Sequence, residues 1–449
     1  MTNRGAPGGM RTFLILWLGQ FVSMIGSGLG SFTLGVWIFE KTGSATSFAL
    51  TAFTAGLTIL VLSPVAGSLA DRWDRRRLLI LSDLGSGLTT LIMAALLWSG
   101  RMQPWYVYPV VALMVGCAVF QGPALLASVS LLVPKEQLAR ASGMTQASQA
   151  ISQILGPLAA GVLIGRIGYS GVILIDFFTF LVSILTVALI RFPSPPRREE
   201  EPGRSPLGDL RQGWDYLRGL PGLFALLWLY AVTNLLIGMV QVLLTPLILS
   251  FATPVALGTV NSAGAAGILL GGLALSIWGG PRRRVAGVLT VLTVQALVLF
   301  LGGLQPSIPL IAAAAFLFML AAPVASACNQ TILQSKVAAG IQGRVFAVAG
   351  MVTACSMPIA ALAAGPLADR VFKPLLVSGG ALAATFVGRL IGTGPGRGVG
   401  LMFICLGALT LLTVGLAALN PRLRGLETEI PDAIEQPERV EPRVVEGVV

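Results

Sequence analysis

Long apolar stretches, separated by short polar segments, follow one another along almost the whole chain. Twelve of these stretches contain about 20 residues, the length at which an α-helix crosses the hydrocarbon core of a bilayer. They cover Thr12–Phe39, Ser47–Leu69, Leu78–Trp98, Trp105–Ala127, Met144–Ile164, Gly171–Ile190, Phe224–Leu249, Ala256–Trp278, Val285–Gly303, Ile308–Ala327, Val345–Leu367 and Gly400–Leu419. The pattern predicts an all-α membrane protein with twelve transmembrane helices.

Polar sequence divides the twelve stretches into two sets of six. Residues 192–221 are rich in proline and in charges of both signs, a composition that does not bury a core. We therefore expect an N-terminal six-helix half over residues 1–191, a cytoplasmic linker over 192–221 and a C-terminal six-helix half over 222–420. The proline-rich, acidic residues 421–449 predict a disordered cytoplasmic tail.

Two segments outside the twelve stretches also carry structural information. In the linker, Leu207, Leu210, Trp214 and Leu217 recur at helical spacing, which predicts either an amphipathic helix on the inner membrane face or a solvated helix or coil. In the second half, the apolar segment near 371–398 is too short between its charged ends to span a bilayer. We place it on the outer side as an insertion in the C-terminal half.

A weak internal repeat relates the two halves. The segments "AAGVLIGR" at 159–166 and "AAGPLADR" at 363–370 are offset by 204 residues, and Arg140 matches Arg344 at the same offset. Short apolar segments match by chance, but a constant offset between equivalent helices supports a duplication of one six-helix unit.

Charge defines the orientation of the chain. The formal net charge is +11, which suggests nucleic-acid binding, but only 11% of the residues are charged and the mean hydropathy is +0.83. With both termini inside, only seven of the 30 Lys and Arg residues fall on the outer side: Lys41, Arg101, Arg166, Arg370, Lys373, Arg389 and Arg397. Basic residues gather in cytoplasmic loops of membrane proteins. We therefore expect no nucleic-acid partner and a multi-pass protein of the plasma membrane, the bacterial inner membrane, with both termini in the cytoplasm.

Several kinds of chemistry find no support in the composition. The chain has no histidine, and its four cysteines contain no CxxC pair, so we expect no metal and no cofactor. A membrane-embedded enzyme would need a cluster of nucleophile, base or metal ligands, and no such cluster is visible. We therefore expect that the protein is not an enzyme.

The densest charge inside the apolar region lies in "GSLADRWDRRR" at 67–77, between the second and third stretches. Its residues Gly67, Leu69, Asp71, Arg72, Arg75 and Arg76 resemble the motif that joins the second and third helices in the major facilitator superfamily, although Asp74 stands where that motif has its second glycine. The resemblance implies the major facilitator fold over nearly the whole chain.

The same resemblance implies a gating role for this hairpin. Asp71 would meet the N-terminal end of the eleventh helix, near Arg344, when the inner side is closed. The unpaired N–H groups and the dipole of a helix N-terminus attract an anion. As an alternative, the basic residues of the hairpin only fix the topology.

The fifth stretch contains "ILGPLAAG" at 154–161, which resembles the fifth-helix motif of drug and proton antiporters in the superfamily through Gly156, Pro157 and Gly161. We interpret these residues as a hinge, because glycine and proline permit a bend and a close approach of another helix. The eighth stretch offers a complementary small-residue face with Gly267 and Gly271. The alternative is ordinary helix packing.

Polar residues on the first, fourth, seventh and eighth helices mark a possible substrate pathway. The first stretch carries Gln20, Ser23, Ser27 and Ser31 on one helical face, and the seventh carries Asn234, Gln241 and Thr245 on another. We expect a pathway lined by Gln20, Ser27, Gln121, Asn234, Gln241 and Asn261. For each single residue, a hydrogen bond between helices is an equally good interpretation.

Acidic residues are rare in the apolar stretches, and two of them stand out. Asp83 and Asp176 lie within about two turns of a helix N-terminus. Either carboxyl is a candidate proton site, and the alternative for both is a structural anchor.

Together these observations predict a secondary transporter, and we expect it to act as a monomer. The segments "LIDFFTF" and "GDLRQGWDYLR", with the charged hairpin, are similar to the macrolide-efflux and siderophore (enterobactin) export branch of drug and proton antiporters. The resemblance implies export of an amphipathic, drug-like small molecule by alternating access, coupled to protons. Lysophospholipid translocation and uptake of a small solute stay open as alternatives, and a channel is a third.

Overall fold

The structure is a computed structural model that describes residues 9–134, 137–190, 206–338 and 340–430. The predictions for the N-terminal residues, for the first part of the linker and for residues 431–449 lie outside the described residues.

The N-terminal half consists of long helices, two of which, α2 and α3, are capped by side chains. It contains α1 (Gly9–Thr42), α2 (Ala45–Arg72), α3 (Arg75–Trp98), η1 (Pro104–Tyr106), α4 (Val107–Leu132) and α5 (Leu138–Leu189). Ser44 caps α2 by accepting a hydrogen bond from the Ser47 N–H, and Asp74 caps α3 by accepting one from the Arg77 N–H at 3.0 Å. Asp74 therefore begins a helix at the position where the resembled motif has a glycine.

The helix labelled α5 contains two spans. A straight helix of its 52 residues would extend for roughly 78 Å, more than twice the thickness of the hydrocarbon core, roughly 30 Å. At Gly168 the backbone takes φ 70° and ψ 176°, a conformation that only glycine adopts readily, and the chain turns back there. The first part thus corresponds to the predicted fifth span and the second part to the sixth.

The C-terminal half follows the same plan with an added segment between its last two spans. It contains α6 (Pro206–Gly219), α7 (Pro221–Leu249), α8 (Pro254–Trp278), α9 (Arg284–Leu304), α10 (Ile308–Lys336), α11 (Gln342–Leu367), η3 (Ala368–Phe372), α12 (Lys373–Leu375), α13 (Phe386–Ile391), α14 (Arg397–Leu419), α15 (Pro421–Arg424) and α16 (Leu426–Glu429). Within the described ranges, eleven helices are long and apolar enough to cross a membrane, and the two spans of α5 bring the total to the predicted twelve.

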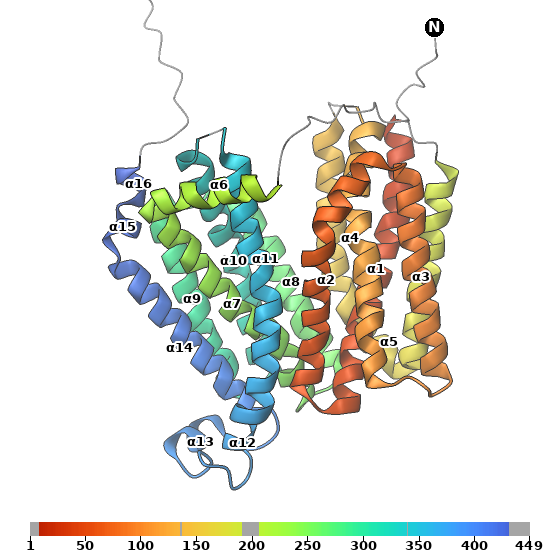
Figure 1. Cartoon of the computed structure of the whole chain (residues 1–449). Coiled ribbons are helices and arrows are strands. Elements are labelled where there is room, and N and C mark those ends of the chain that lie inside the picture. The colour runs from red at the N-terminus through yellow and green to blue at the C-terminus, as the bar shows by residue number, and fades with distance from the viewer. Residues whose placement is uncertain (1–8, 135–136, 191–205, 339, 431–449) are drawn as a thin grey trace, which may run out of the picture.

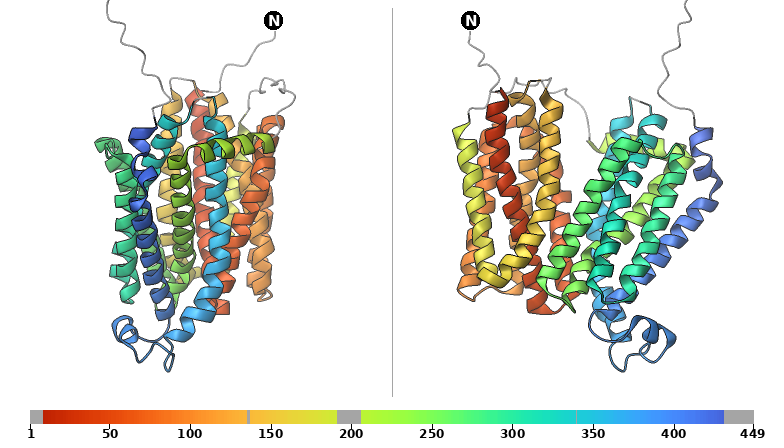
Figure 2. Two further views of the ribbon diagram at one scale, coloured as in Figure 1. Left: turned by 60° about the vertical axis from the view of Figure 1, so that its left-hand side comes forward. Right: turned by 180° about the vertical axis from the view of Figure 1, so that it is seen from behind.

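The two halves form separate bundles that lie side by side (Figure 1). We call the end that carries α6 and α15 the linker face, and the end that carries α12 and α13 the insertion face. The bundles approach each other at the insertion face and diverge toward the linker face (Figure 2). Between them, α2 packs on α11 and α5 packs on α8. The prediction of an all-α, twelve-helix membrane fold in two halves is confirmed.

Helix α6 has the predicted amphipathic character, but its apolar face is covered by protein. Leu217 is fully buried, and Leu210 and Trp214 pack on the same cluster of the C-terminal half. Gly213 lies so close to the main chain of Arg344 that a Cβ atom there would be 2.6 Å from the Arg344 carbonyl oxygen. The expectation that α6 rests on the membrane surface is therefore corrected: the helix lies across α7 and the first turn of α11.

The insertion between η3 and α14 lies at the end of the C-terminal bundle away from α6 (Figure 1) and is held to the bundle by Arg397. This side chain is 3% exposed, and its Nη1 donates to the Ile391 carbonyl at 3.1 Å and to the Leu304 carbonyl at 3.3 Å. Leu376, Ile391 and Leu401 form a small core beneath the insertion. Arg397 thus joins the ends of α9 and α13.

The expected disorder from residue 421 onward is corrected for its first ten residues. Leu423 and Leu426 are buried against the C-terminal half, and Glu427 Oε1 accepts hydrogen bonds from the N–H groups of Arg284 and Val285 at the start of α9. Lys336 Nζ donates to the carbonyl groups of Glu427 and Ile430. The composition of the tail concealed these few apolar and capping residues.

We predict that removal of this ordered segment destabilises the protein. Truncation after Asn420 exposes the surfaces that Leu423 and Leu426 cover and removes two carbonyl acceptors of Lys336, a loss of about 3–6 kcal/mol for the two leucines. The measurement is the thermal unfolding midpoint of the purified protein in detergent. Truncation after Ile430 is the matched control and should leave the midpoint unchanged; equal midpoints for both truncations would contradict the prediction.

Candidate functional site

A cavity of about 940 Å³ lies between the two halves. The N-terminal half contributes mainly α1 and α5, and the C-terminal half contributes α7, α8, α9, α10 and α14. This volume suits a drug-sized organic molecule, because pockets for such ligands measure about 300–1,000 Å³. None of the lining residues in the described part of the chain is Asp, Glu, Lys or Arg.

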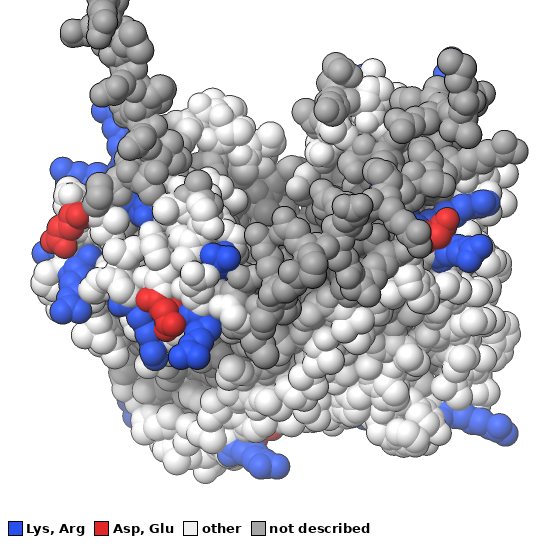
Figure 3. Space-filling view, turned by 45° about the horizontal axis from the view of Figure 1, so that its top comes forward, with Lys and Arg blue, Asp and Glu red and all other residues white. Residues whose placement is uncertain are grey.

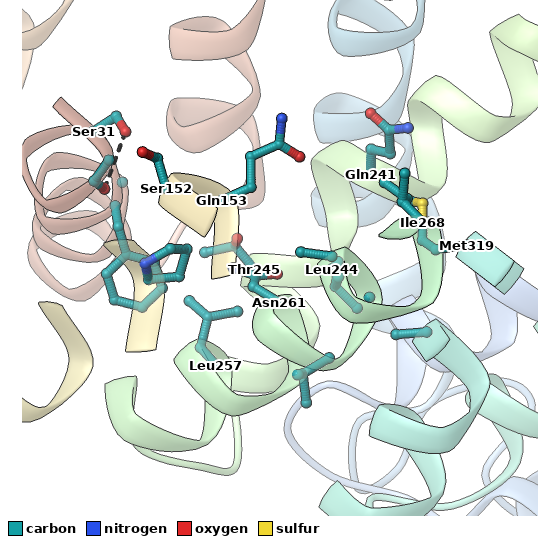
Figure 4. A pocket seen from close by; sticks show the side chains of 18 of the residues that line it. Ser31, Ser152, Gln153, Gln241, Leu244, Thr245, Leu257, Asn261, Ile268 and Met319 are labelled. Atoms are coloured by element: carbon teal, nitrogen blue, oxygen red, sulfur yellow. Dashed lines mark hydrogen bonds between the residues drawn. The ribbon is translucent and has the colours of Figure 1, made fainter. Parts of the chain in front are cut away.

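The two walls of the cavity differ in chemistry. The N-terminal half presents amides and hydroxyls from Gln20, Ser23, Ser27, Ser31, Gln121, Gln149, Ser152 and Gln153. The C-terminal half is mainly aliphatic and aromatic, with Leu244, Leu257, Val260, Ile268, Val298, Leu299, Ile311, Phe318, Met319 and Phe403, and its polar members are Gln241, Thr245 and Asn261. Figure 4 shows Ser31, Ser152 and Gln153 on one side of the cavity and Gln241, Ile268 and Met319 on the other.

The structure brings together five of the six residues expected along the pathway. Gln20, Ser27, Gln121, Gln241 and Asn261 all line the cavity. Asn234 is not among the lining residues, and its side-chain amide donates to the carbonyl of Tyr230, one turn earlier in α7, at 2.8 Å. A polar side chain that bonds to its own helix is satisfied without a ligand.

Asp83 on α3 is completely buried behind the polar wall and is fully hydrogen-bonded. Its Oδ1 accepts from Gln121 Nε2 at 2.6 Å, and its Oδ2 accepts from Ser183 Oγ at 2.7 Å. Gln20 connects the two donors, because its Nε2 donates to Ser183 Oγ at 2.7 Å and its Oε1 accepts from Gln121 at 3.0 Å. Gln20 and Gln121 also line the cavity, so they connect it with the carboxyl of Asp83.

Ser183 was missing from the sequence-based set. The sequence hints at it only through its position, two turns after Asp176 and on the same face of the sixth span. The sequence does not say that this face meets α3.

Asp176 is also completely buried, but neither of its carboxyl oxygens has a hydrogen-bond partner in the structure. The carboxyl group lies against α1 at Gly26 and Gly30, where a Cβ atom on either glycine would be within 3 Å of it. A charged carboxylate without donors is costly to bury. The surroundings of Asp176 therefore differ from those of Asp83, whose two oxygens both accept hydrogen bonds.

The glycine and proline residues of α5 lie at close helix contacts. Gly156 packs on Gly28 of α1, where the two backbones are so close that a Cβ on Gly156 would be 3.0 Å from the Gly28 Cα. Gly161 packs on Pro254 at the start of α8, and Pro157 presents its carbonyl to Gly258 of the same helix. Pro157 lies inside the continuous helix of α5. The hinge function of these residues stays a prediction.

Gly267 and Gly271 pack elsewhere than expected. Cβ atoms at these positions would be 2.4 Å from the Phe316 carbonyl oxygen and 2.2 Å from the Leu320 carbonyl oxygen, respectively. Both carbonyls belong to α10, in the same half. The expectation that this glycine face of α8 complements the Gly156–Gly161 segment is therefore corrected, because Gly258, two to four turns earlier, meets α5 instead.

The charged hairpin lies at the linker face between α2 and α3. The structure describes the backbone of α2 to Arg72, including Gly67, while the side chains of Asp71 and Arg72 lie outside the described part. Arg76 Nη2 donates to the Ala188 carbonyl at the end of α5, at 2.5 Å, which ties the hairpin to the N-terminal half. Arg344 lies in the first turn of α11, beneath α6.

At the insertion face, η3, which directly continues α11, contacts the beginning of α2 through Asp369, a residue that the sequence pattern did not single out. Its Oδ2 accepts hydrogen bonds from the Thr46 N–H at 2.8 Å and from the hydroxyls of Ser44 and Thr46, both at 2.7 Å. Its Oδ1 accepts from the Ala45 N–H at 3.2 Å. One carboxylate of the C-terminal half thus caps a helix of the N-terminal half.

Comparisons with known proteins agree with this architecture. Among curated proteins, macrolide efflux protein A of Streptococcus pyogenes is 29% identical over 369 residues, covering 80% of this chain and 90% of the relative. The multidrug efflux pump Tap of Mycolicibacterium fortuitum is 26% identical over 345 residues, covering 74% of this chain and 83% of the relative.

Solved structures share the fold at low sequence identity. A bacterial homolog of the human lysosomal transporter Spinster, in an inward-facing and unoccupied conformation, has a TM-score of 0.67 at 13% identity and covers 91% of this chain and 95% of its own. The nucleoside transporter NupG has a TM-score of 0.68 at 13% identity, with coverage of 93% and 100%.

A family model extends over most of the chain. The description of that model is Major Facilitator Superfamily, and it matches residues 16–361, from the first span into the eleventh. The chain therefore belongs to the Major Facilitator Superfamily and is a multi-pass membrane transporter, not an enzyme.

Proposed function

We propose that this transporter exports an amphipathic, drug-like organic compound by alternating access. The observation that carries the proposal is the cavity of about 940 Å³, which has no charged lining residue in the described chain and combines a polar wall with an apolar wall. A molecule with one polar and one apolar side satisfies both walls without leaving a buried charge unpaired. The efflux proteins among the relatives support the same substrate class.

The described conformation corresponds to one of the two states that alternating access requires. The halves diverge toward the linker face and are in contact at the insertion face (Figure 2). In the other state, we propose that the charged hairpin closes the linker face, with Asp71 at the N-terminal end of α11 near Arg344. The dipole of that helix end would stabilise the carboxylate.

We assign the linker face to the cytoplasm. Seen obliquely from this face, Lys and Arg side chains lie over α6 and along the rim of both halves (Figure 3). Arg211 and Arg218 on α6 are among the exposed basic residues there. The excess of basic residues in cytoplasmic loops supports this orientation in the bacterial inner membrane.

We propose protons as the coupling ion and the pair of buried acids as their carriers. In the described state both carboxyl groups are buried, and hydrogen-bond donors reach both oxygens of Asp83 but neither oxygen of Asp176. Gln20 and Gln121 give a substrate in the cavity a route to Asp83. Substrate binding would move these two amides and so change the hydrogen bonds that the carboxyl group of Asp83 accepts.

We predict that filling the cavity stops transport. Ala315→Trp places an indole into the cavity and should lower the efflux of a macrolide by about tenfold or more, since a binding loss of 1.4 kcal/mol already corresponds to tenfold. The measurement is accumulation of labelled macrolide in an efflux-deficient host. Leu301→Trp on the exposed surface of α9 is the control and should transport normally. Equal efflux from both variants would show that substrates do not use this cavity.

We predict that Asp83→Asn separates transport from the proton gradient. Asparagine keeps the volume but cannot carry a proton, so uptake into reconstituted vesicles should no longer respond to an imposed pH difference, while exchange of bound substrate continues. Asp215→Asn, on exposed α6, is the control and should retain the response. A full pH response in Asp83→Asn would remove this residue from the coupling mechanism.

We predict that the linker face is cytoplasmic, which cysteine labelling can test. On intact cells, a membrane-impermeant maleimide should label a cysteine that replaces Arg389 on α13 but not one that replaces Gln212 on α6, and lysis should expose both. The parent protein controls for its four native cysteines. Labelling of position 212 in intact cells would reverse the assigned orientation.

A further inference from the structure

Helices α2 and α11 come from different halves and are in close contact at the insertion face. A Cβ atom on Gly365 of α11 would be 2.6 Å from the Thr46 Cα in the first turn of α2. Farther along the pair, a Cβ on Gly56 would be 2.8 Å from the ring of Pro358. The two helices run antiparallel, because the last residues of α11 meet the first residues of α2.

Asp369 completes this contact with four hydrogen bonds across the boundary between the halves. Its carboxylate receives two main-chain N–H groups from the first residues of α2 and two hydroxyl groups, from Ser44 and Thr46. The first N–H groups of a helix have no partner within the helix, so an external carboxylate satisfies them and interacts favourably with the helix dipole. Such charge-assisted bonds are stronger than neutral ones.

The sequence that supplies this contact occurs twice in the chain. Residues 364–370 read "AGPLADR" at the end of α11, and residues 66–72 read "AGSLADR" at the end of α2, with one difference. Since α2 and α11 are antiparallel, one copy lies at the insertion face and the other at the linker face. The copy at the insertion face contacts the other half in the described conformation, while the halves diverge toward the linker face (Figure 2).

We propose that Asp369 is a positioning residue for transport that holds the insertion face closed, as a counterpart at the opposite end of the same helix pair to the role proposed above for Asp71 at the linker face. The proposal rests on the alternating access proposed above. The contact of Asp369 is the one formed in the described conformation, and it must break before the insertion face opens. The α2–α11 pair would then have an acidic residue at each end that stabilises one of the two closed faces, and we call such a contact a latch.

Among the described residues, the α5–α8 contact between the halves has no acidic residue equivalent to Asp369. At the repeat offset of 204 residues, the position of α5 equivalent to Asp369 is Gly165, and α8 ends at Trp278 and Gly279 without an acidic residue. The α5–α8 pair contacts through Gly161, Gly258 and a hydrogen bond from Ser262 to the Ile154 carbonyl at 2.6 Å. We infer that this pair acts as a pivot while the α2–α11 pair opens at alternate ends.

The test measures the populations of the two states directly. Spin labels at Arg101 and Gln305 report the separation of the halves at the insertion face, and labels at Gln137 and Ala338 report it at the linker face, in the full-length protein in nanodiscs. Asp369→Asn should raise the ratio of insertion-face-open to linker-face-open protein by about tenfold, since one charge-assisted contact is lost from one state only. Asp71→Asn should lower the ratio by a similar factor.

The double variant separates a latch from a merely structural role. If each acid stabilises one state, Asp71→Asn combined with Asp369→Asn should return the ratio close to that of the parent, and Asp369→Glu, which keeps the charge, should largely preserve it. Glu40→Gln is the matched control, because Glu40 accepts a hydrogen bond from Tyr169 at the same face but within one half. Unchanged distances in Asp369→Asn, or additive loss of folded protein in the double variant, would overturn the proposal.

A second variant covers the case in which Asp369→Asn fails to fold. Gly365→Ala pushes α2 and α11 apart only at the insertion face and should shift the populations in the same direction. Macrolide flux of the parent tests the proposed function separately. Flux without any population shift in these variants would reject the latch and retain the transporter, whereas a shift without flux would retain the latch and reject the substrate class.

Discussion

The two halves of this transporter meet through main-chain surfaces, and the rest of its behaviour depends on that contact. Gly161, Gly258 and Gly365 each place a backbone where a Cβ atom would collide with the other half. Between helices in a membrane there is little hydrophobic driving force, so close packing and a few hydrogen bonds set the strength of association. Each hydrogen bond between the halves therefore has a large effect on the relative free energies of the two conformations. A carboxylate that binds one helix end is strong enough to matter and weak enough to release.

Most of the fold could be predicted from the sequence because the bilayer imposes a length on each helix and a side on each basic residue. The twelve stretches all became helices, and the turn between the fifth and sixth lies at Gly168, in the gap predicted between them. The ends of the chain were less predictable. Leu423 and Leu426 lie in a short segment whose average composition is polar, and only their contacts with α7 and α9 explain why it is ordered.

The candidate site was predictable where a residue type alone identifies its surroundings. An amide on an apolar helix must face a partner or a cavity, and this rule identified Gln20, Gln121, Gln241 and Asn261 as cavity residues. The same rule could not distinguish them from Asn234, whose amide donates a hydrogen bond within its own helix. Pairings between distant helices were beyond the sequence. The bond of Ser183 to Asp83, the contact of Gly267 with α10 and the capping of α2 by Asp369 each depend on which helices are neighbours.

The chemical division of the cavity also has a consequence for how firmly a substrate can be held. The polar wall belongs to one half and the apolar wall to the other. A molecule that fits both walls well therefore holds the two halves together. A ligand stabilises the conformation in which it makes its contacts, so the best-fitting molecule would also be the slowest to allow the halves to separate. Molecules that bind both walls less tightly would be transported across the membrane more often. In such a cavity, the tightest ligand is an inhibitor, and broad tolerance of substrates follows from loose fit.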